Sequence, residues 1–166
     1  MMLKENMIPE AVLLDTSFFI RLLDEKDSLN KSADEYLKFF LDNEVELMLS
    51  VISIAEYCVY GEVTELPMKY LRVIPFNIDH AIKTGEFASV LFKQRKSGAT
   101  IDRRLIQNDV KLFAQCEILK SVGAFITSDA RSRTIFETLK VTNLIRFDFV
   151  DISTPCNETF GTLGLS

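Results

Sequence analysis

Short apolar runs alternate along this chain with longer segments whose apolar residues recur every three to four positions. The runs "AVLL" at 11–14 and "AFIT" at 124–127 contain almost no polar residues. A run of this kind is typical of a strand that is covered on both faces of its sheet. The strands expected are 11–14, 46–50, 70–76, 124–127 and 144–152, the last of them from its alternating apolar and polar residues.

Helical periodicity occupies the segments between these runs. Asn77 is a favourable first residue for a helix, and Gly61 and Gly123 are favourable ends for two others. The helices expected are 15–23, 28–44, 51–61, 77–96, 101–123 and 129–139.

This alternation of strands and helices predicts an α/β fold with three layers. We expect helices on both faces of a mainly parallel sheet of four to five strands. No repeat or Gly/Ser-rich linker divides the chain, so residues 1–152 are expected to form one domain and 153–166 a tail. In such sheets, ligands bind beyond the carboxyl ends of the strands.

The composition limits where the chain is expected to work. The 166 residues are 48% hydrophobic and 26% charged, as in an ordinary globular domain. No apolar run approaches the ~20 residues needed to cross a bilayer, and the first ten residues lack the apolar core of a secretion signal. We therefore expect a cytoplasmic protein without a membrane partner.

Cysteine and histidine offer little for chemistry. Cys58, Cys116 and Cys156 are scattered, and we expect reduced thiols rather than a disulfide framework or a zinc site. His80 is the only histidine, and we expect a structural or surface role for it. Carboxylates are therefore the expected carriers of any catalytic chemistry.

Two aspartates directly follow predicted strands. Asp15 comes after 11–14, and Asp129 comes shortly after 124–127, which places both at the ligand-binding edge of the sheet. Each of them, taken alone, is also well explained as the N-cap of the next helix.

Two further carboxylates interrupt apolar helical faces. Glu56 lies in the stripe of Ile52, Ala55 and Val59, and Asp109 interrupts the stripe of the 101–123 helix. Burying an unpaired carboxylate is costly.

Two partners could compensate the buried charge. One is a buried salt bridge, with Arg21, Arg72 or Arg104 as candidates. The other is a shared divalent cation, for which oxygen ligands suit Mg²⁺ or Mn²⁺.

The charge is unevenly distributed along the chain. Residues 1–66 carry a net charge of −9, whereas residues 67–140 carry +6 within a total of −5. Basic residues of the second segment lie close in sequence to Asp109 and Asp129, where they are either ordinary solvated surface or a rim that guides the phosphates of a bound polyanion. They are Lys93, Arg95, Lys96, Arg103, Arg104, Arg131 and Arg133.

Taken together, these motifs resemble the PIN-domain family, which includes the VapC-like toxin ribonucleases. "LLDTS" matches the first strand with its aspartate, "ISIAEY" the helical glutamate, "QNDVKLFAQC" the acidic residue of a long helix, and "FITSDA" the Thr-x-Asp after a strand. The resemblance covers most of the chain and implies a PIN-like fold.

For function, the resemblance implies a nuclease that cleaves RNA with Mg²⁺ or Mn²⁺. Asp15, Glu56, Asp109 and Asp129 would be both the catalytic residues and the metal site, with Asp15 and Asp109 as direct ligands. The hydroxyl groups of Thr16, Ser17, Thr127 and Ser128 would orient water or contact phosphate, although helix capping explains them equally well.

The resemblance also implies partners. An RNA substrate, an antitoxin protein and a second copy of the chain in a homodimer are expected. Two alternatives remain: a non-catalytic PIN-like module that binds RNA or protein, and a DNA-repair or rRNA-processing nuclease.

Overall fold

A single parallel sheet forms the centre of the molecule. The computed structural model describes residues 7–94 and 107–161, and within them five strands pair in the order β3-β2-β1-β4-β5. Every pair is parallel, which confirms the predicted α/β architecture. The strands are β1 (Ala11–Leu14), β2 (Glu46–Ser50), β3 (Leu71–Ile74), β4 (Val122–Thr127) and β5 (Asp148–Asp151).

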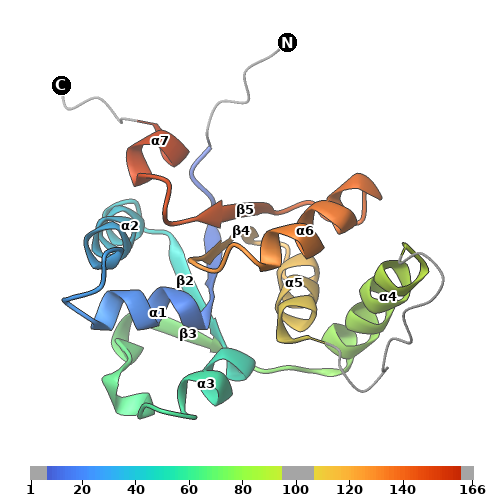
Figure 1. Ribbon diagram of the computed structural model, residues 1–166, viewed down its shortest axis with the longest axis horizontal. Coiled ribbons are helices and arrows are strands. Elements are labelled where there is room, and N and C mark those ends of the chain that lie inside the picture. Colours follow the sequence, from blue (N-terminus) through green and yellow to red (C-terminus); the bar gives the residue numbers. More distant parts are fainter. Residues whose placement is uncertain (1–6, 95–106, 162–166) are drawn as a thin grey trace.

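Helices cover both faces of this sheet (Figure 1). The helix α1 and its neighbours α2 and α7 pack on one face, and α4, α5 and α6 pack on the other. The described helices are α1 (Thr16–Leu23), α2 (Asn30–Asp42), α3 (Val51–Tyr57), α4 (Ile78–Gln94), α5 (Asn108–Ile118), α6 (Ser132–Val141) and α7 (Cys156–Phe160). Two short 3₁₀ turns, Val63–Glu65 and Met68–Tyr70, lead into β3.

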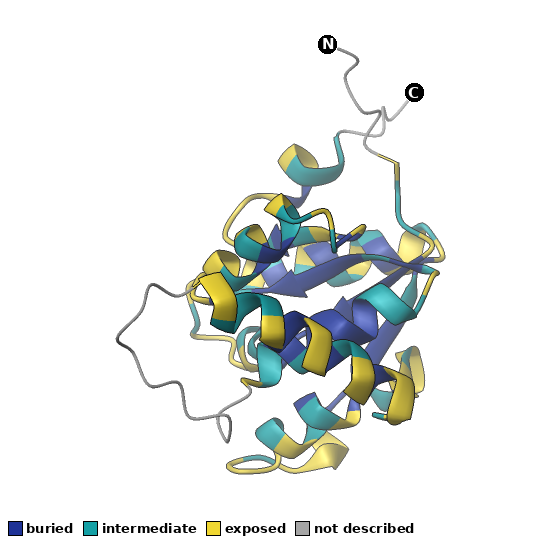
Figure 2. Ribbon diagram, turned by 90° about the vertical axis from the view of Figure 1, so that its right-hand side faces the viewer, coloured by how far each residue is buried: buried dark blue, intermediate teal, exposed yellow. Residues whose placement is uncertain are grey.

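Successive side chains of β1 contribute in turn to the two halves of the core, one on each face of the sheet. Ala11 and Leu13 belong to the cluster beneath α4, α5 and α6, and Val12 and Leu14 belong to the cluster beneath α1 and α2. Successive side chains of a strand point to opposite faces, so a fully apolar strand must be covered twice. Figure 2 shows a buried centre in dark blue, to which β1, β2 and β4 contribute most, whereas the edge strands β3 and β5 are partly exposed.

The helix predicted for 101–123 ends earlier than expected. Its described part is α5, which stops at Ile118, and residues 101–106 lie outside the described residues. Gly123 does not end the helix but lies within β4. A Cβ atom at this position would lie 2.7 Å from Cβ of Pro9, so the glycine permits a close approach of two chain segments.

The boundaries of four other elements also differ. α6 begins at Ser132 rather than at 129, β3 is limited to Leu71–Ile74, and β5 begins only at Asp148. The end of α3 at Tyr57 leaves Val59 outside the helix and 65% exposed. These boundaries moved because local patterns do not specify where pairing and packing stop.

Part of the predicted tail is folded. α7 lies against α2, where the ring of Phe160 stacks on Phe39 with 4.9 Å between ring centroids. The hydroxyl group of Tyr36 donates to the carbonyl of Thr154 over 2.8 Å. The packed part of the domain therefore extends to residue 160, beyond the boundary expected at 152.

The remaining expectations concern thiols, the histidine and membrane spans. All three cysteines are free; Cys116 and Cys156 are buried, and Cys58 is exposed. His80 is buried, and its Nδ1 accepts from the backbone N–H of Asn77 over 3.2 Å, as expected of a structural residue. Across the described parts of the chain, no helix is both long and apolar enough to cross a membrane.

Candidate functional site

The four predicted carboxylates gather beyond the carboxyl ends of the central strands. Asp15 follows β1 directly, Asp129 follows β4, Glu56 lies in α3 after β2, and Asp109 lies in the first turn of α5. β1 lies between β2 and β4 in the sheet, so the connections diverge there. This divergence is the point at which open α/β sheets form their ligand crevices.

Asp15 is held by hydroxyl groups rather than serving as a helix cap. Its Oδ2 accepts from Ser17 Oγ over 2.6 Å and from Thr127 Oγ1 over 2.8 Å. It occupies the N-cap position of α1, but its side chain makes no capping hydrogen bond. Burial raises the pKa of this carboxyl group above its ordinary value, and the two hydroxyl donors oppose that effect.

Asp109 shows that the carboxylates lie within electrostatic range of one another. Burial, followed by the negative charges of the other three carboxylates, raises the pKa of Asp109 to about 6. The nearby Arg131 acts in the opposite direction. Like charges and low dielectric both favour the protonated form, so the side chain lacks sufficient countercharge.

Glu56 is fixed from two sides by neutral donors. Thr16 Oγ1 donates to its Oε2, and Asn108 Nδ2 donates to its Oε1, each over 2.7 Å. Lys111 Nζ donates to Asn108 Oδ1 over 3.2 Å, which orients the amide with its NH₂ group toward Glu56. Both oxygens of the carboxylate are therefore occupied by donors.

Asn108 and Lys111 are site residues that the sequence analysis missed. Asn108 immediately precedes Asp109, and Lys111 follows one turn later on the same side of α5. Polar residues at the first turn of a helix are usually explained by capping, which is why these two were not singled out. Their position beside a predicted ligand was the only signal that could have identified them.

The inward direction of Glu56 was predicted correctly and Ile52 packs against the core, but the other two expected apolar neighbours do not. Ala55 and Val59 are exposed, and Ser53 is the buried residue of α3. Glu56 lies three residues after Ser53, which places the two on one helical face.

Asp129 is bound by an arginine of its own turn. Arg131 donates from Nε to Oδ1 over 3.0 Å and from Nη2 to Oδ2 over 2.8 Å, and its backbone N–H donates to Oδ1 over 2.9 Å. These hydrogen bonds and the positive charge hold the pKa of Asp129 below its ordinary value. Asp129 is not the N-cap of α6, which is Arg131; its carboxylate instead closes the turn just before the helix.

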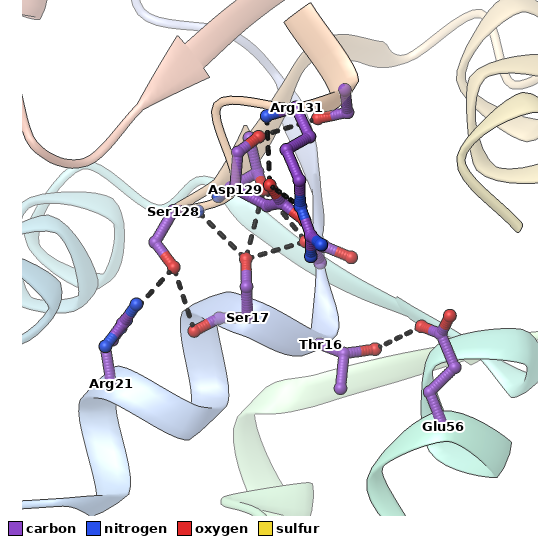
Figure 3. A network of polar contacts seen from close by, with 10 residues as sticks. Thr16, Ser17, Arg21, Glu56, Ser128, Asp129 and Arg131 are labelled. Carbon is purple, nitrogen blue, oxygen red and sulfur yellow. Dashed lines mark hydrogen bonds and ion pairs between the residues drawn. The ribbon is translucent and has the colours of Figure 1, made fainter.

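The predicted hydroxyl residues join α1 to the turn after β4 (Figure 3). Ser17 Oγ accepts from the backbone N–H of Ser128 over 2.9 Å and lies 3.0 Å from Thr127 Oγ1. Thr127 Oγ1 also accepts from the backbone N–H of Asp129 over 2.9 Å. These bonds bring Asp15 and Asp129 to one place, although they are 114 positions apart in the sequence.

The salt-bridge alternative fails for two of its three candidates. Arg21 pairs with Asp27, and Arg72 pairs with Glu46. Neither arginine therefore neutralises Glu56 or Asp109, and Arg104 lies outside the described residues.

Most of the predicted basic rim lies outside the described residues or is otherwise engaged. Lys93 is exposed in the last turn of α4, and Arg95, Lys96, Arg103 and Arg104 fall in the segment that is not described. Arg133 lies over the ring of Phe149 and 3.9 Å from Asp151. Of the predicted set, Arg131 alone is described in direct contact with a site carboxylate.

The carboxylate oxygens of the site are ligands that suit a hard divalent cation. Their present orientation does not direct them at one ion. Within residues 7–94 and 107–161, no three Asp, Glu, His or Cys side chains converge on a point that would hold a metal ion. Glu56 faces Thr16 and Asn108, and Asp129 faces Arg131. Asp15 and Asp109 retain a buried, mutually repelling charge, which a bound cation would relieve.

Comparison with known proteins identifies the fold. No protein-family model and no curated protein matches the sequence. Among solved structures, VapBC-1 from nontypeable Haemophilus influenzae aligns with a TM-score of 0.58 at 21% identity, over 87% of this chain and 99% of that one. VapBC2 from Rickettsia felis, bound to a promoter DNA fragment, aligns with a TM-score of 0.57 at 16% identity, over 85% and 99%.

A third structure gives the same result over a shorter span. VapC20 from Mycobacterium tuberculosis, a toxin that cleaves the sarcin-ricin loop, aligns with a TM-score of 0.50 at 16% identity, over 74% of this chain and 93% of that one. At such identities a likeness concerns the fold. The predicted resemblance is therefore confirmed at that level: this chain has the PIN-domain fold of the VapC toxin structures.

Proposed function

We propose that this protein is a divalent-metal-dependent endoribonuclease that cleaves RNA phosphodiester bonds. The observation that supports it best is Asp109, whose pKa is raised to about 6 by burial beside three other carboxylates at the ligand-binding edge of the sheet. A structural role does not account for four acidic groups within electrostatic range of one another, because their repulsion destabilises the folded state. A cation and a phosphate substrate give the arrangement a use.

The residues divide between ligands and supports. Asp15 and Asp109 are the proposed direct ligands, and Glu56 and Asp129 complete the set directly or through water. When bound, Mg²⁺ or Mn²⁺ would activate water and stabilise the charge on the attacked phosphate. The hydroxyls of Ser17 and Thr127 hold the Asp15 carboxylate in place, as outer hydrogen bonds commonly do around metal ligands.

Two isosteric substitutions test this proposal. Asp15→Asn and Asp109→Asn keep the shape of the side chain and remove its charge, so each should abolish Mn²⁺-dependent cleavage of a single-stranded RNA. The control is Asp42→Asn at the exposed end of α2, which should leave cleavage unchanged. Circular dichroism verifies the fold in each case, and full activity in both site variants would refute the metal-site assignment.

A non-catalytic module remains a second candidate because of one observation. Arg131 already neutralises Asp129, and no three described ligands converge. Titration calorimetry with MnCl₂ separates the two functions. Binding that is lost in Asp109→Asn supports the nuclease, whereas no binding by the wild-type protein supports the module.

A toxin role rests on the structural neighbours. Solved structures with this fold include VapBC-1, VapBC2 bound to a DNA fragment from its promoter, and the DNA-bound VapBC of Salmonella typhimurium. We therefore propose that this chain is the toxin of a type II pair, has an antitoxin partner and forms a homodimer. Expression should arrest growth, co-expression of a small neighbouring gene should relieve it, and light scattering should give twice the 18.9 kDa chain mass.

Without growth arrest, the toxin role fails while the nuclease assignment stands. An rRNA-processing or DNA-repair nuclease would then account for the same site, and assays on structured RNA and on DNA would distinguish them.

A further inference from the structure

A cavity adjoins the carboxylates on the side of α1. It has a volume of about 410 Å³ and is lined by Ser17, Ile20, Arg21, Ser128, Asp129 and Arg131. Half of this lining comes from the helix after β1 and half from the turn after β4. The cavity therefore lies at the divergence of the central strands, next to Asp15, which Ser17 contacts directly.

The polar lining is suited to an anion. Two guanidinium groups, two hydroxyl groups and the carboxylate of Asp129, which Arg131 neutralises, line this space, and in the view of Figure 3 Ser17 and Ser128 lie between Arg21 and Arg131. Arg21 Nε donates to Ser128 Oγ over 3.3 Å, and its Nη1 pairs with Asp27. Arginine binds phosphate with a planar fork of donors, so the two guanidinium groups are the anion-binding groups of this lining.

The two arginines differ in how readily they change partner. Arg21 is held by Ser128 and Asp27, so its guanidinium is positioned in advance. The side chain of Arg131 is 91% exposed, and its partner Asp129 is 29% exposed. Exposed ion pairs contribute little stability, so Arg131 can exchange the carboxylate for a phosphate at small cost.

One apolar group completes the lining. Ile20 is half exposed although it follows a fully buried pair, Phe18 and Phe19. An apolar side chain beside two arginines suits a ligand with a charged part and a flat or apolar part. A nucleotide has both, and the cavity volume falls within the range of about 300–1,000 Å³ for small-ligand sites.

We propose that this cavity binds one nucleotide of a single-stranded RNA, next to the phosphate that is cleaved. Arg21 and Arg131 hold the phosphate of that nucleotide, and Ile20 packs against its ribose or base. The inference rests on the proposed nuclease function. It extends that function by naming an RNA-binding subsite that includes Arg21 and Ile20.

Binding without catalysis provides the test. A short fluorescein-labelled single-stranded RNA is titrated with full-length protein in EDTA at several KCl concentrations, and the dissociation constant is measured by fluorescence anisotropy. Arg21→Gln and Arg131→Gln should each weaken binding about 3–10-fold and reduce the slope of log K against log salt by about 0.7 per lost phosphate contact.

Two further variants make the result specific. Arg72→Gln is the matched control, because Arg72 is also a surface arginine in an ion pair, with Glu46, but lies on β3. It should leave affinity and salt slope unchanged. Ile20→Ala should weaken binding about 2–3-fold with an unchanged salt slope, since the lost contact is not ionic.

Folding of each variant is verified by thermal unfolding, and Arg21→Lys replaces Arg21→Gln if the latter does not fold. Affinities of both arginine variants equal to that of Arg72→Gln would overturn the subsite. Weakened binding of polyglutamate with unchanged RNA affinity would also overturn it and would assign the cavity to an acidic protein. Because no metal is present, a failure of the nuclease proposal, seen as full cleavage by Asp15→Asn, remains distinguishable from either result.

Discussion

The carboxylates on the two sides of the acidic site have different partners: neutral donors on one side and a positive charge on the other. On the side of α3 and α5, Glu56 is held by the neutral groups of Thr16 and Asn108. On the side of α6, Asp129 is paired with the guanidinium group of Arg131. Burial and the neighbouring carboxylates raise the pKa of Asp109 to about 6, whereas hydrogen bonds from Arg131 hold the pKa of Asp129 below its ordinary value.

This difference indicates where an external cation is needed. The α6 side carries its own positive charge on an exposed, exchangeable side chain. The α5 side holds carboxylates in fixed positions without neutralising Asp109. We infer that a metal ion would be bound mainly from the α5 side and that Asp129 would join after Arg131 moves away.

The largest effect is expected from the support of Glu56. Asn108→Ala removes one of its two hydrogen bonds together with the link to Lys111. Loss of such an outer support typically costs 10–100-fold in metal affinity or activity, so Mn²⁺-dependent cleavage should fall by about that factor. Asn157→Ala in α7 is the control, and equal rates for the two variants would show that Asn108 does not position Glu56.

A smaller effect is expected on the free energy of unfolding in the absence of metal. Its sign should differ between substitutions of Asp109 and of Asp129. Because the folded protein raises the pKa of Asp109 from 3.8 to about 6, wild-type stability declines as the pH rises through that interval. Asp109→Asn avoids this decline and should be more stable than the wild type by about 1–2 kcal/mol at pH 7.5, allowing for its partial exposure to solvent. At a pH below 3.8 the two proteins should be equally stable.

Urea unfolding in EDTA measures this difference. Asp129→Asn is the comparison, because a lowered pKa means that ionised Asp129 stabilises the folded state above its ordinary pKa. That variant should show no gain at pH 7.5. A gain in Asp129→Asn but not in Asp109→Asn would reverse the assignment of the two sides.

The smallest effect is expected on the affinity for Mn²⁺ when the positive charge of Arg131 is removed. Arg131→Gln frees Asp129 and withdraws a positive charge that also acts on Asp109. Mn²⁺ should therefore bind about 3-fold more tightly, even though RNA binding weakens. Calorimetry measures the affinity, and Arg133→Gln, whose arginine lies near Asp151 and over Phe149, should leave it unchanged. Weaker metal binding by Arg131→Gln would mean that Arg131 supports the metal site instead of competing with it.

Local pattern was sufficient for most of the framework. Apolar runs predicted β1 and β4, because a parallel strand that is covered twice admits few polar residues, and the alternation of apolar and polar residues predicted β5. Asp15 and Asp129 were placed at the sheet edge for the same reason. The ends of elements were less accurate: Gly123 was expected to end a helix but lies in β4, where close contact with Pro9 excludes a side chain.

The sequence by itself determined the order of strands and helices and the location of four carboxylates at one end of the sheet. The tertiary structure decided their partners. Glu56 contacts Asn108, which is 52 positions away in the sequence, and Ser17 contacts Thr127, which is 110 positions away. Periodicity predicts which way a side chain points from its own element, whereas a hydrogen bond depends on how two distant elements are packed. For that reason the sequence predicted a cluster of negative charge, and the fold determined that one aspartate is neutralised from within while another is not.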